Sequence, residues 1–273
     1  MKTVNELITA SAKDLPKSEI EYILITLLKK ERHELYLQES KVSDKIAKKF
    51  QRLVQQRKKG MPVQYLLNSA HFLEYELYVD ERVFIPRPET EELVIKTIHR
   101  LQSPNLILEL GTGSGAIAIA LANAFLETKI IANDISPEAL EVAKKNIAKY
   151  NLIDRISLIQ ANLFNLPDTQ SFFQRFDCLI SNPPYIDQNI IPALSPTVKD
   201  FEPIKSLDGG QNGFEIIRTI LKQGMNFLKP EGILALEIDP AQKDLISAEV
   251  PRAEFEIDLS NKIRFCFIKH ILS

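Results

Sequence analysis

From residue 105 onward, apolar segments of strand length alternate with segments of helical length. The predicted strands are 106–110, 129–134, 156–160, 176–181 and 233–238, and the predicted helices are 115–125, 137–150 and 213–228. This alternation is typical of a largely parallel sheet with helices on both faces. Two further predicted strands, 255–259 and 263–269, end the chain as a pair. The sequence therefore predicts an α/β fold for this region.

The first 60 residues have a different pattern. Apolar side chains recur at helical spacing over 18–30 and 43–59, with no strand signal, and this predicts a small helical domain over residues 1–70. Aromatic and β-branched residues over 71–79 predict a short hairpin, which belongs to a hairpin and linker segment over 71–88. Pro86-Arg87-Pro88 then opens a helix. The α/β domain is predicted over residues 89–273.

Composition excludes several classes of protein. Of the 273 residues, 45% are apolar and 26% are charged, which is ordinary for a soluble globular protein. The chain has no apolar run long enough to span a membrane, and its N-terminus has no apolar core of a secretory signal. Cys178 and Cys266 both lie in apolar runs, which indicates buried free thiols in a reducing, cytoplasmic setting.

Charge is distributed unevenly along the chain. Residues 1–60 hold 14 Lys and Arg against 8 Asp and Glu, whereas the remainder holds 20 against 28. An acidic partner or RNA could use the basic segment, and solvated helix faces would give the same count. The overall net charge of −2 argues against a general polyanion binder.

A glycine-rich run follows the strand 106–110 and opens a helix. It reads Glu109-Leu110-Gly111-Thr112-Gly113-Ser114-Gly115-Ala116. Glycines let the backbone turn tightly near a ligand, and the helix N-terminus adds free N–H donors. Asp134, at the end of the next strand, can accept hydrogen bonds from ribose hydroxyls, as in either an NAD or an S-adenosylmethionine site. The acidic residue two positions before the first glycine resembles the signature of class I S-adenosylmethionine-dependent methyltransferases.

The run Asn182-Pro183-Pro184-Tyr185 follows the strand 176–181, at the sheet edge where α/β proteins bind ligands. The two prolines fix the backbone and remove two donors. The loop then presents acceptors, the Asn182 side-chain oxygen and the Pro183 carbonyl, which suit a planar NH₂ group. Tyr185 offers a π-face to a planar amide or base. Such a loop can orient a poorly nucleophilic amide or aromatic amine nitrogen for methyl transfer.

Taken with these two motifs, the chain resembles the release factor glutamine methyltransferase (PrmC/HemK) family. Four further stretches carry the resemblance: 60–67 (GMPVQYLL), 84–91 (FIPRPETE), 201–203 (FEP) with 207–210 (LDGG), and 236–238 (LEI) with Gln242. The resemblance implies a Rossmann-like domain with a mostly parallel seven-stranded sheet and an antiparallel C-terminal strand. It also implies methyl transfer from S-adenosylmethionine to the glutamine amide of the Gly-Gly-Gln motif in class 1 peptide chain release factors, with S-adenosylhomocysteine as the product.

The resemblance also implies residue roles. Cofactor contacts are expected from Glu109, Gly111, Thr112, Gly113, Ser114, Gly115, Asp134, Asn162, Leu163 and Asn182. Catalytic and substrate contacts are expected from Asn182, Pro183, Pro184 and Tyr185, with Arg87 as a further substrate-binding residue. No metal, no membrane contact and no stable nucleic-acid binding are expected, and the basic N-terminal helices are expected to dock the release factor onto a monomeric enzyme.

The chain departs from the family pattern at a few positions. Asn162 stands where the family usually has Asp, and its oxygen can still accept a hydrogen bond from the adenine amine. Leu163 replaces a Trp of some members, and Asn68 and Asn261 replace glycines, which Asn does with little strain in the left-handed region. Gly209-Gly210-Gln211 spells the substrate motif, but it is expected to be a loop before a helix.

Three other functions account for part of the pattern. A DNA or RNA amine methyltransferase would present adenine N6 to the same loop after base flipping, and the basic N-terminal segment favours it. Only 88 residues follow Tyr185, however, and these leave no separate recognition domain. A non-catalytic protein that binds release factors would explain Asn162. An NAD oxidoreductase would explain the glycines but not the Asn-Pro-Pro-Tyr loop.

Overall fold

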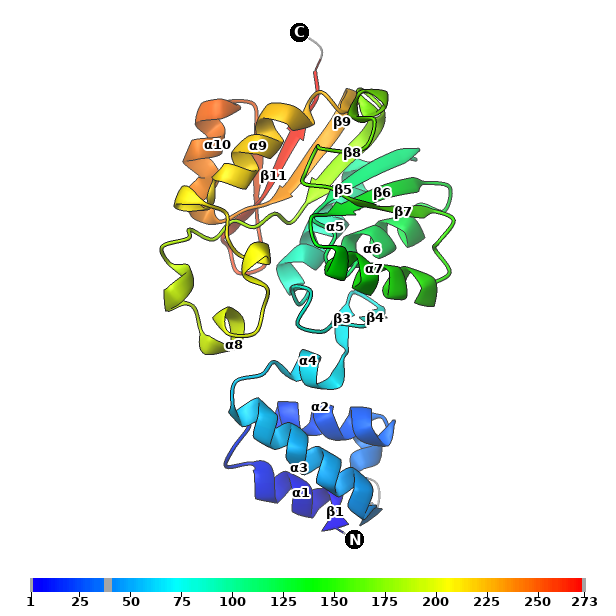
Figure 1. Cartoon of the computed structure of the whole chain (residues 1–273), viewed down its shortest axis with the longest axis vertical. Coiled ribbons are helices and arrows are strands. Elements are labelled where there is room, and N and C mark those ends of the chain that lie inside the picture. Colours follow the sequence, from blue (N-terminus) through cyan, green and yellow to red (C-terminus); the bar gives the residue numbers. More distant parts are fainter. Residues whose placement is uncertain (1, 37–40, 272–273) are drawn as a thin grey trace. The chain divides into compact units, whose positions relative to one another are not determined.

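The computed structural model describes residues 2–36 and 41–271, and the chain divides into two compact units (Figure 1). Residues up to Ser69 form the first unit together with Ser195–Phe201. Ala70–Leu194 and the residues from Glu202 onward form the second. The return of Ser195–Phe201 to the first unit was not anticipated from the sequence.

The first unit is a small helical bundle. Its helices are α1 (Val4–Ser11), α2 (Lys17–Leu28), α3 (Asp44–Lys58) and α4 (Val63–Leu67). Ser43 caps α3 by accepting a hydrogen bond from the Ile46 N–H, as its position before the helix favours. Apolar stripes of the helices meet in a core that includes Ile20, Leu24 and Phe50. The absence of strands expected here is wrong, because β1 (Lys2–Thr3) pairs antiparallel with β2 (Lys41–Val42).

The second unit is built on a seven-stranded sheet. Its strands are β5 (Leu106–Leu110), β6 (Lys129–Asp134), β7 (Ile156–Gln160), β8 (Phe176–Ser181), β9 (Leu228–Glu237), β10 (Glu254–Ile257) and β11 (Ile263–Lys269). The order across the sheet is β10-β11-β9-β8-β5-β6-β7. The five strands from β9 to β7 are parallel, and β11 is antiparallel to β9 and to β10. The predicted mostly parallel sheet with an antiparallel C-terminal strand is confirmed.

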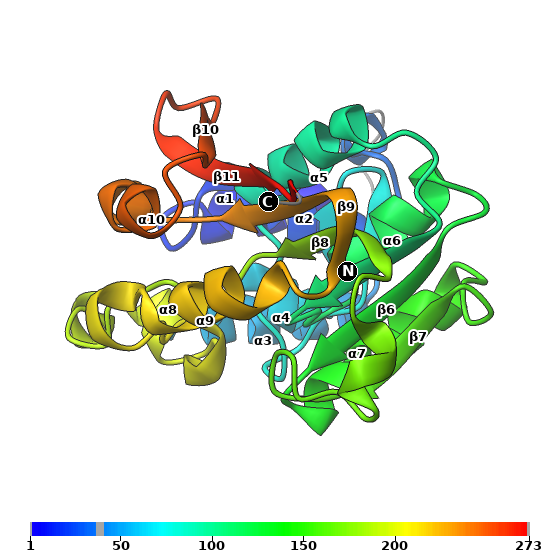
Figure 2. The same cartoon turned by 90° about the horizontal axis from the view of Figure 1, so that it is seen from above.

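Helices cover both faces of the sheet, so alternate residues of its strands enter two cores. One core contains side chains of α5 (Pro88–Arg100), α6 (Ala116–Ala124) and α7 (Pro137–Lys149). The other contains side chains of α9 (Glu215–Gly224) and α10 (Lys243–Glu249). Figure 2 shows α5 and α9 on opposite sides of the sheet. Cys178 faces the first core and Cys266 the second, and both are buried free thiols, as predicted.

The smaller elements agree with the sequence in most places. β3 (Ala70–Phe72) and β4 (Tyr75–Leu77) form the predicted hairpin, and α8 (Pro196–Lys199) is a single turn. The predicted helix 213–228 is too long, because α9 ends at Gly224 and β9 already begins at Leu228. Residues 229–232, which lie between the predicted helix and the predicted strand 233–238, bulge out of β9 where its register with β8 shifts. Within the described residues, no helix is long and apolar enough to span a membrane.

The connections place the carboxyl ends of β5 and β8 side by side. The chain leaves β5 toward β6 and β7, then returns to β8 on the other side of β5. Leu110 at the end of β5 is the register partner of Ser181 at the end of β8, and the Ser181 hydroxyl donates to the Leu110 carbonyl at 2.8 Å. This reversal of strand order is where open α/β sheets bind ligands.

Candidate active site

The glycine-rich loop between β5 and α6 leaves room for a ligand. Gly111 and Gly113 have φ values of 71° and 54°, which L side chains rarely adopt, and no atom lies within 4 Å of a Cβ placed on either. Behind the loop, Asn146 of α7 is fully buried and donates from Nδ2 to the Ser114 carbonyl at 2.9 Å. Asn146 thus fixes the loop on the side of α7, and the loop has free space at Gly111 and Gly113.

Glu109 is a buried carboxyl group beside this loop. Its Oε2 accepts a hydrogen bond of 2.8 Å from the Thr112 hydroxyl, whereas its Oε1 has no hydrogen-bond partner among the described residues. Burial raises the pKa of Glu109 to about 8, since the charged form loses its hydration. An unpaired buried carboxylate oxygen is costly, so the site suits a ligand with a cationic or N–H group.

Asp134 and Asn133 join the glycine-rich loop to the neighbouring loops. The Asp134 carboxylate accepts the Gly113 N–H and the Ser136 N–H, each at 2.9 Å, and burial raises its pKa. Asn133 donates from Nδ2 to the Leu163 carbonyl at 2.6 Å. Leu163 has a φ of 48°, and the adjacent Asn162 is exposed. The predicted cofactor residues other than Asn182, which follows β8, therefore lie around one loop cluster at the carboxyl edge of β5 to β7.

The Asn-Pro-Pro-Tyr loop follows β8 and is tied to α5 and β9. Asn182 Nδ2 donates to Thr90 Oγ1 at 2.8 Å, and Thr90 Oγ1 donates to Glu237 Oε2 at 2.6 Å. The Tyr185 hydroxyl donates to the other oxygen of the same carboxylate at 3.0 Å. Glu237 is 1% exposed, and burial raises its pKa to about 7. Burial and the Glu237 charge also raise the pKa of Tyr185.

Two further segments, one at Gln242 and one at 209–211, contact the backbone around this motif. Gln242 Nε2 donates to the carbonyls of Tyr185 and Gly213, at 3.0 and 2.6 Å. The Gly209 N–H donates to the Ile186 carbonyl at 2.9 Å. The run Gly209-Gly210-Gln211 lies in the second of these segments, a loop that precedes α9, as expected. In the structure this loop packs against the backbone of Pro184 and Tyr185 and bonds the Ile186 that follows.

Arg87 ends the segment before α5 and forms an ion pair with Glu202. The Glu202 side chain is 1% exposed and that of Arg87 is 32% exposed. Burial raises the pKa of Glu202, and the Arg87 charge opposes that rise. The guanidinium also lies 4.6 Å from the centre of the Phe84 ring. The structure thus gives Arg87 an intramolecular partner, and its predicted contact with substrate stays a prediction.

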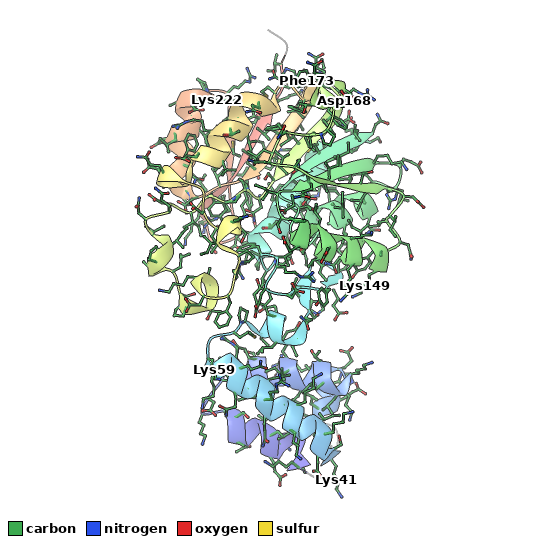
Figure 3. The ribbon with its side chains drawn as sticks, viewed as in Figure 1. Lys41, Lys59, Lys149, Asp168, Phe173 and Lys222 are labelled. Atoms are coloured by element: carbon green, nitrogen blue, oxygen red, sulfur yellow. The ribbon has the colours of Figure 1, made fainter. Side chains whose placement is uncertain are left out.

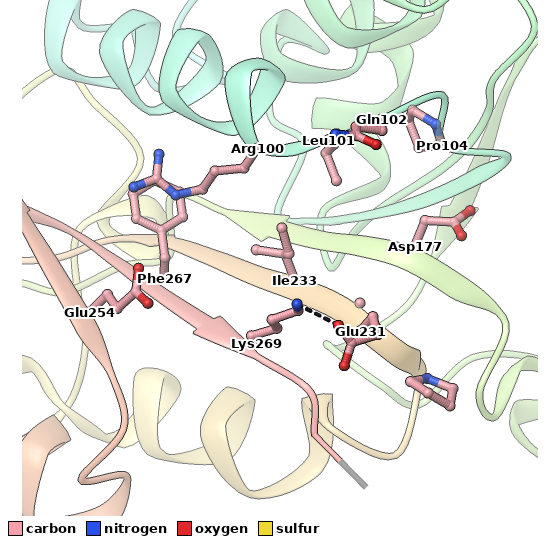
Figure 4. A pocket seen from close by; sticks show the side chains of 12 residues that line it. Arg100, Leu101, Gln102, Pro104, Asp177, Glu231, Ile233, Glu254, Phe267 and Lys269 are labelled. Carbon is pink, nitrogen blue, oxygen red and sulfur yellow. Dashed lines mark ion pairs between the residues drawn. The ribbon is translucent and has the colours of Figure 1, made fainter.

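A cavity of about 550 Å³ lies at the opposite edge of the sheet (Figure 4). It is bordered by the amino ends of β5 and β8 and contains none of the predicted site residues. Two of its charged groups pair with each other, Lys269 with Glu231, and Asp177 pairs with Lys229 at 2.6 Å. Over residues 2–36 and 41–271, no group of three or more His, Cys, Asp and Glu side chains could hold a metal ion.

The glycine-rich and Asn-Pro-Pro-Tyr loops were predicted from the sequence, but the residues that form hydrogen bonds to them were not. Thr90, Glu237 and Gln242 lay within the stretches quoted for the resemblance, yet nothing in the sequence assigned them a partner. Asn146 left a weaker signal, because it is a polar residue on the buried stripe of α7 that includes Ala139, Val142 and Ala143. Such a buried amide must find hydrogen-bond partners, and here it finds the glycine-rich loop.

The fold and the site together define a Rossmann-like, S-adenosylmethionine-dependent methyltransferase. A methyltransferase domain model matches residues 102–261, which is more than half of the chain, and a PrmC N-terminal domain model matches residues 3–67. Among solved structures, a methyltransferase from Pyrococcus furiosus has a TM-score of 0.53 at 18% identity, and the match covers 73% of this chain and 91% of that one. A ribosomal protein L11 methylase from Lactobacillus delbrueckii has a TM-score of 0.50 at 21% identity, with 70% and 83% covered. These similarities establish the fold.

Sequence relatives identify the family. The chain is 41% identical to a release factor glutamine methyltransferase from Thermosynechococcus vestitus, over 81% of this chain and 77% of that protein. It is 39% identical to one from Rhodopirellula baltica, over 82% and 77%. It is 32% identical to one from Bacillus cereus, over 90% of each. The chain therefore belongs to the release factor glutamine methyltransferase family.

Proposed function

We propose that this chain methylates the glutamine side-chain amide of the Gly-Gly-Gln motif in class 1 peptide chain release factors. The observation that carries the proposal is the placement of two loops on adjacent strands. The glycine-rich loop ends β5, the Asn-Pro-Pro-Tyr loop ends β8, and Leu110 and Ser181 at those ends are register partners. A cofactor on the first loop would face an amide on the second.

The cofactor side of the proposal has support in two features. The open space over Gly111 and Gly113 leaves room for a ligand. Glu109 Oε1 has no hydrogen-bond donor among the described residues, so a ligand could supply one. S-adenosylmethionine carries an ammonium group that suits a buried carboxylate, and it supplies a methyl group activated by the sulfonium. We assign Thr112, Ser114, Gly115, Asp134, Asn162, Leu163 and Asn182 to the same site, with Asp134 as the acceptor for ribose hydroxyls.

The substrate side depends on acceptors. Asn182 uses its NH₂ group on Thr90, and its Oδ1 accepts no hydrogen bond from the described residues. Pro183 and Pro184 have no N–H, so the backbone there offers carbonyl oxygens only. These oxygens would accept the two hydrogens of the glutamine amide, direct its nitrogen toward the methyl donor, and stabilise the positive charge that grows on that nitrogen. Tyr185 would border the amide plane, and Arg87 would contact the release factor.

The first unit would dock the release factor. Lys45, Lys48, Lys49 and Arg52 recur at helical spacing along α3, are exposed, and form no ion pairs among the described residues. We call these four residues the α3 basic stripe. Arg57 and Lys58 differ, because they pair with Glu19 and Asp14. Figure 3 shows Lys41 and Lys59 at the two ends of α3, so positive charge continues past the stripe. Such a face suits an acidic protein surface.

The remaining assignments follow from this reaction. A translation factor as substrate places the enzyme in the cytoplasm, and we propose that it acts as a monomer. The alternative of a DNA or RNA amine methyltransferase is not favoured, since the relatives named above are release factor glutamine methyltransferases. Stable binding of nucleic acid is not part of the proposal.

The experiment that tests the proposal is transfer of radiolabel from methyl-labelled S-adenosylmethionine to a purified class 1 release factor. Label should enter the wild-type factor and not a factor whose Gly-Gly-Gln glutamine is replaced by alanine. Equal labelling of both factors would refute the proposed acceptor. Labelling of duplex DNA or ribosomal RNA instead would favour the alternative.

A further inference from the structure

Two side chains outside the Asn-Pro-Pro-Tyr motif, Thr90 and Glu237, form a continuous chain of hydrogen bonds with it. The bonds run from Asn182 Nδ2 to Thr90 Oγ1, and from Thr90 Oγ1 to one oxygen of Glu237. The Tyr185 hydroxyl donates to the other oxygen. Thr90 and Glu237 are 5% and 1% exposed, so water competes little for these bonds.

The direction of each bond follows from Glu237. An ionised carboxylate can only accept, so both hydroxyls must donate to it. Thr90 has a single hydroxyl hydrogen, and once Glu237 takes it, Thr90 Oγ1 can only accept from Asn182. The amide group facing Thr90 must then be NH₂, and the Asn182 oxygen is left for another donor. Protonated Glu237 removes this constraint, because it could donate to Thr90. The Thr90 hydroxyl could then donate to Asn182, and the Asn182 amide could rotate so that its oxygen faces Thr90.

We infer that Thr90 and Glu237 are positioning residues that fix the Asn182 amide with its oxygen available to the substrate, an inference that rests on the proposed function. Neither residue needs to touch the glutamine. Their effect reaches the reaction through the orientation of Asn182, since the reversed amide would present a donor to a substrate group that has only donors to offer.

The inference makes the acid side of the pH profile depend on Glu237. The charged and titratable groups around it are Tyr185 in the loop, Glu89 on α5 and Arg264 on β11. Burial raises the Glu237 pKa to about 7, although the Thr90 and Tyr185 hydroxyls and the Arg264 charge each lower it. As the pH rises through this value, the ionised form that locks Asn182 accumulates and kcat rises.

The test uses full-length variants with S-adenosylmethionine and a class 1 release factor. Thr90→Val should lower kcat by about tenfold or more, within the hundredfold that a misplaced reacting group can cost. Its KM for the release factor should change by less than about threefold, because the correct orientation of Asn182 stabilises the transition state and not the bound substrate. Thr90→Ser keeps the hydroxyl and should restore kcat. Glu237→Gln should lower kcat and abolish its rise with pH.

Matched controls separate positioning from packing. Thr97 is a second buried threonine on α5, and its hydroxyl donates to the Leu93 carbonyl, away from the site. Thr97→Val should therefore leave kcat and its pH profile unchanged. Glu256→Gln is a control for loss of a carboxylate away from the site, since Glu256 is partly exposed on β10 and pairs with Lys96 and Arg100.

A spectroscopic measurement keeps the inference testable whatever the activity. The side-chain NH₂ signals of Asn182 are identified by their loss in Asn182→Asp, and they should shift and exchange faster with water in Thr90→Val but not in Thr97→Val. An unchanged Asn182 signal or an unchanged kcat in Thr90→Val would overturn the inference. A wild-type enzyme that fails to methylate any release factor while the Asn182 signal still responds to Thr90→Val would overturn the proposed function and retain the orientation of Asn182.

Discussion

The guanidinium of Arg87 and the carboxylate of Glu202 form an ion pair across 115 positions of sequence. The pair joins the segment before α5 to the segment after residue 201, and both lie in the second unit. Since the Glu202 side chain is 1% exposed, its charge depends on Arg87 for compensation. Two of the stretches that carry the family resemblance thus meet in one contact.

Loss of Arg87 should destabilise the protein before it affects chemistry. Arg87→Met leaves a buried carboxylate unpaired, and we expect a loss of about 1–3 kcal/mol in the free energy of unfolding at pH 7. Denaturant unfolding measures this loss. The double variant Arg87→Met with Glu202→Met should recover much of it, because an apolar pair can replace a buried ion pair. Wild-type stability in Arg87→Met alone would show that the pair is not needed.

The Arg87→Lys variant separates stability from substrate binding. It keeps a positive charge beside Glu202, so stability should remain near that of the wild type. If Arg87 also contacts the release factor through its planar guanidinium, KM for the factor should rise in this variant. An unchanged KM would remove Arg87 from the substrate site.

Asn182→Ala tests the principal acceptor for the substrate amide. We expect kcat to fall by about 10²–10³, as for other lost electrostatic partners in a transition state. The Kd for S-adenosylmethionine, measured by calorimetry, should change far less. Equal losses in kcat and in cofactor affinity would show that Asn182 acts through the cofactor alone and not as the acceptor for the substrate amide.

Glu109 makes cofactor binding release a proton. With a pKa of about 8, the free enzyme holds Glu109 mostly neutral at pH 7. A bound ammonium group favours the carboxylate, so the pKa falls on binding and the proton leaves to the buffer. Calorimetric titrations in buffers of different ionisation enthalpy should show this release at pH 7, and Glu109→Gln should abolish it. Identical enthalpies in all buffers for the wild-type enzyme would contradict the assignment.

The α3 basic stripe should act on whole release factors only. Reversing Lys45, Lys48, Lys49 and Arg52 to Glu should raise KM for the intact factor and reduce its dependence on salt. Turnover of a short Gly-Gly-Gln peptide should not change. Lys222→Glu with Lys243→Glu, on exposed positions of the second unit, controls for charge reversal away from the stripe, and the double variant Lys48→Glu with Arg52→Glu matches its change in net charge. A stripe variant with wild-type KM for the factor would exclude α3 from docking.

Gly213 should tolerate no side chain. A Cβ there would lie 2.0 Å from the Tyr185 carbonyl oxygen, and its φ of 64° adds strain for any L residue. Gly213→Ala should therefore displace the Asn-Pro-Pro-Tyr backbone and lower kcat. Gly224→Ala is the matched control, since its Cβ would meet Leu179 at 3.4 Å inside a helix that favours alanine. Wild-type kinetics in Gly213→Ala would show that the support is dispensable.

The sequence predicted best those strands that neighbouring residues alone define. β5, β6, β7, β8 and β11 have the predicted bounds, because apolar runs covered on both faces end where polar residues begin. β1 and β2 are too short for any alternation, and their pairing joins positions about 40 residues apart. The predicted strand 233–238 lacks the first part of β9, because the bulge at 229–232 depends on the register with β8, which the local sequence does not specify.

The candidate site likewise has parts that could be predicted from neighbouring residues and parts that could not. Both loops carry their own signal, since glycines and prolines restrict the backbone wherever they stand. The bonds from Asn182 to Thr90 and from Thr90 to Glu237 span 92 and 147 positions, and only the pairing of β8 with β9 and the packing of α5 bring these residues together. The sequence could therefore predict the groups that meet cofactor and substrate, but not those that orient them.

Mass spectrometry of the Gly-Gly-Gln peptide from a class 1 release factor, after incubation with the purified protein and S-adenosylmethionine, tests the proposed methyl transfer directly. We predict a gain of one methyl group, localised by fragmentation to the glutamine side chain, and a much slower gain when Asn182→Ala replaces the wild-type enzyme. An unmodified glutamine, with cofactor binding intact, would contradict this prediction.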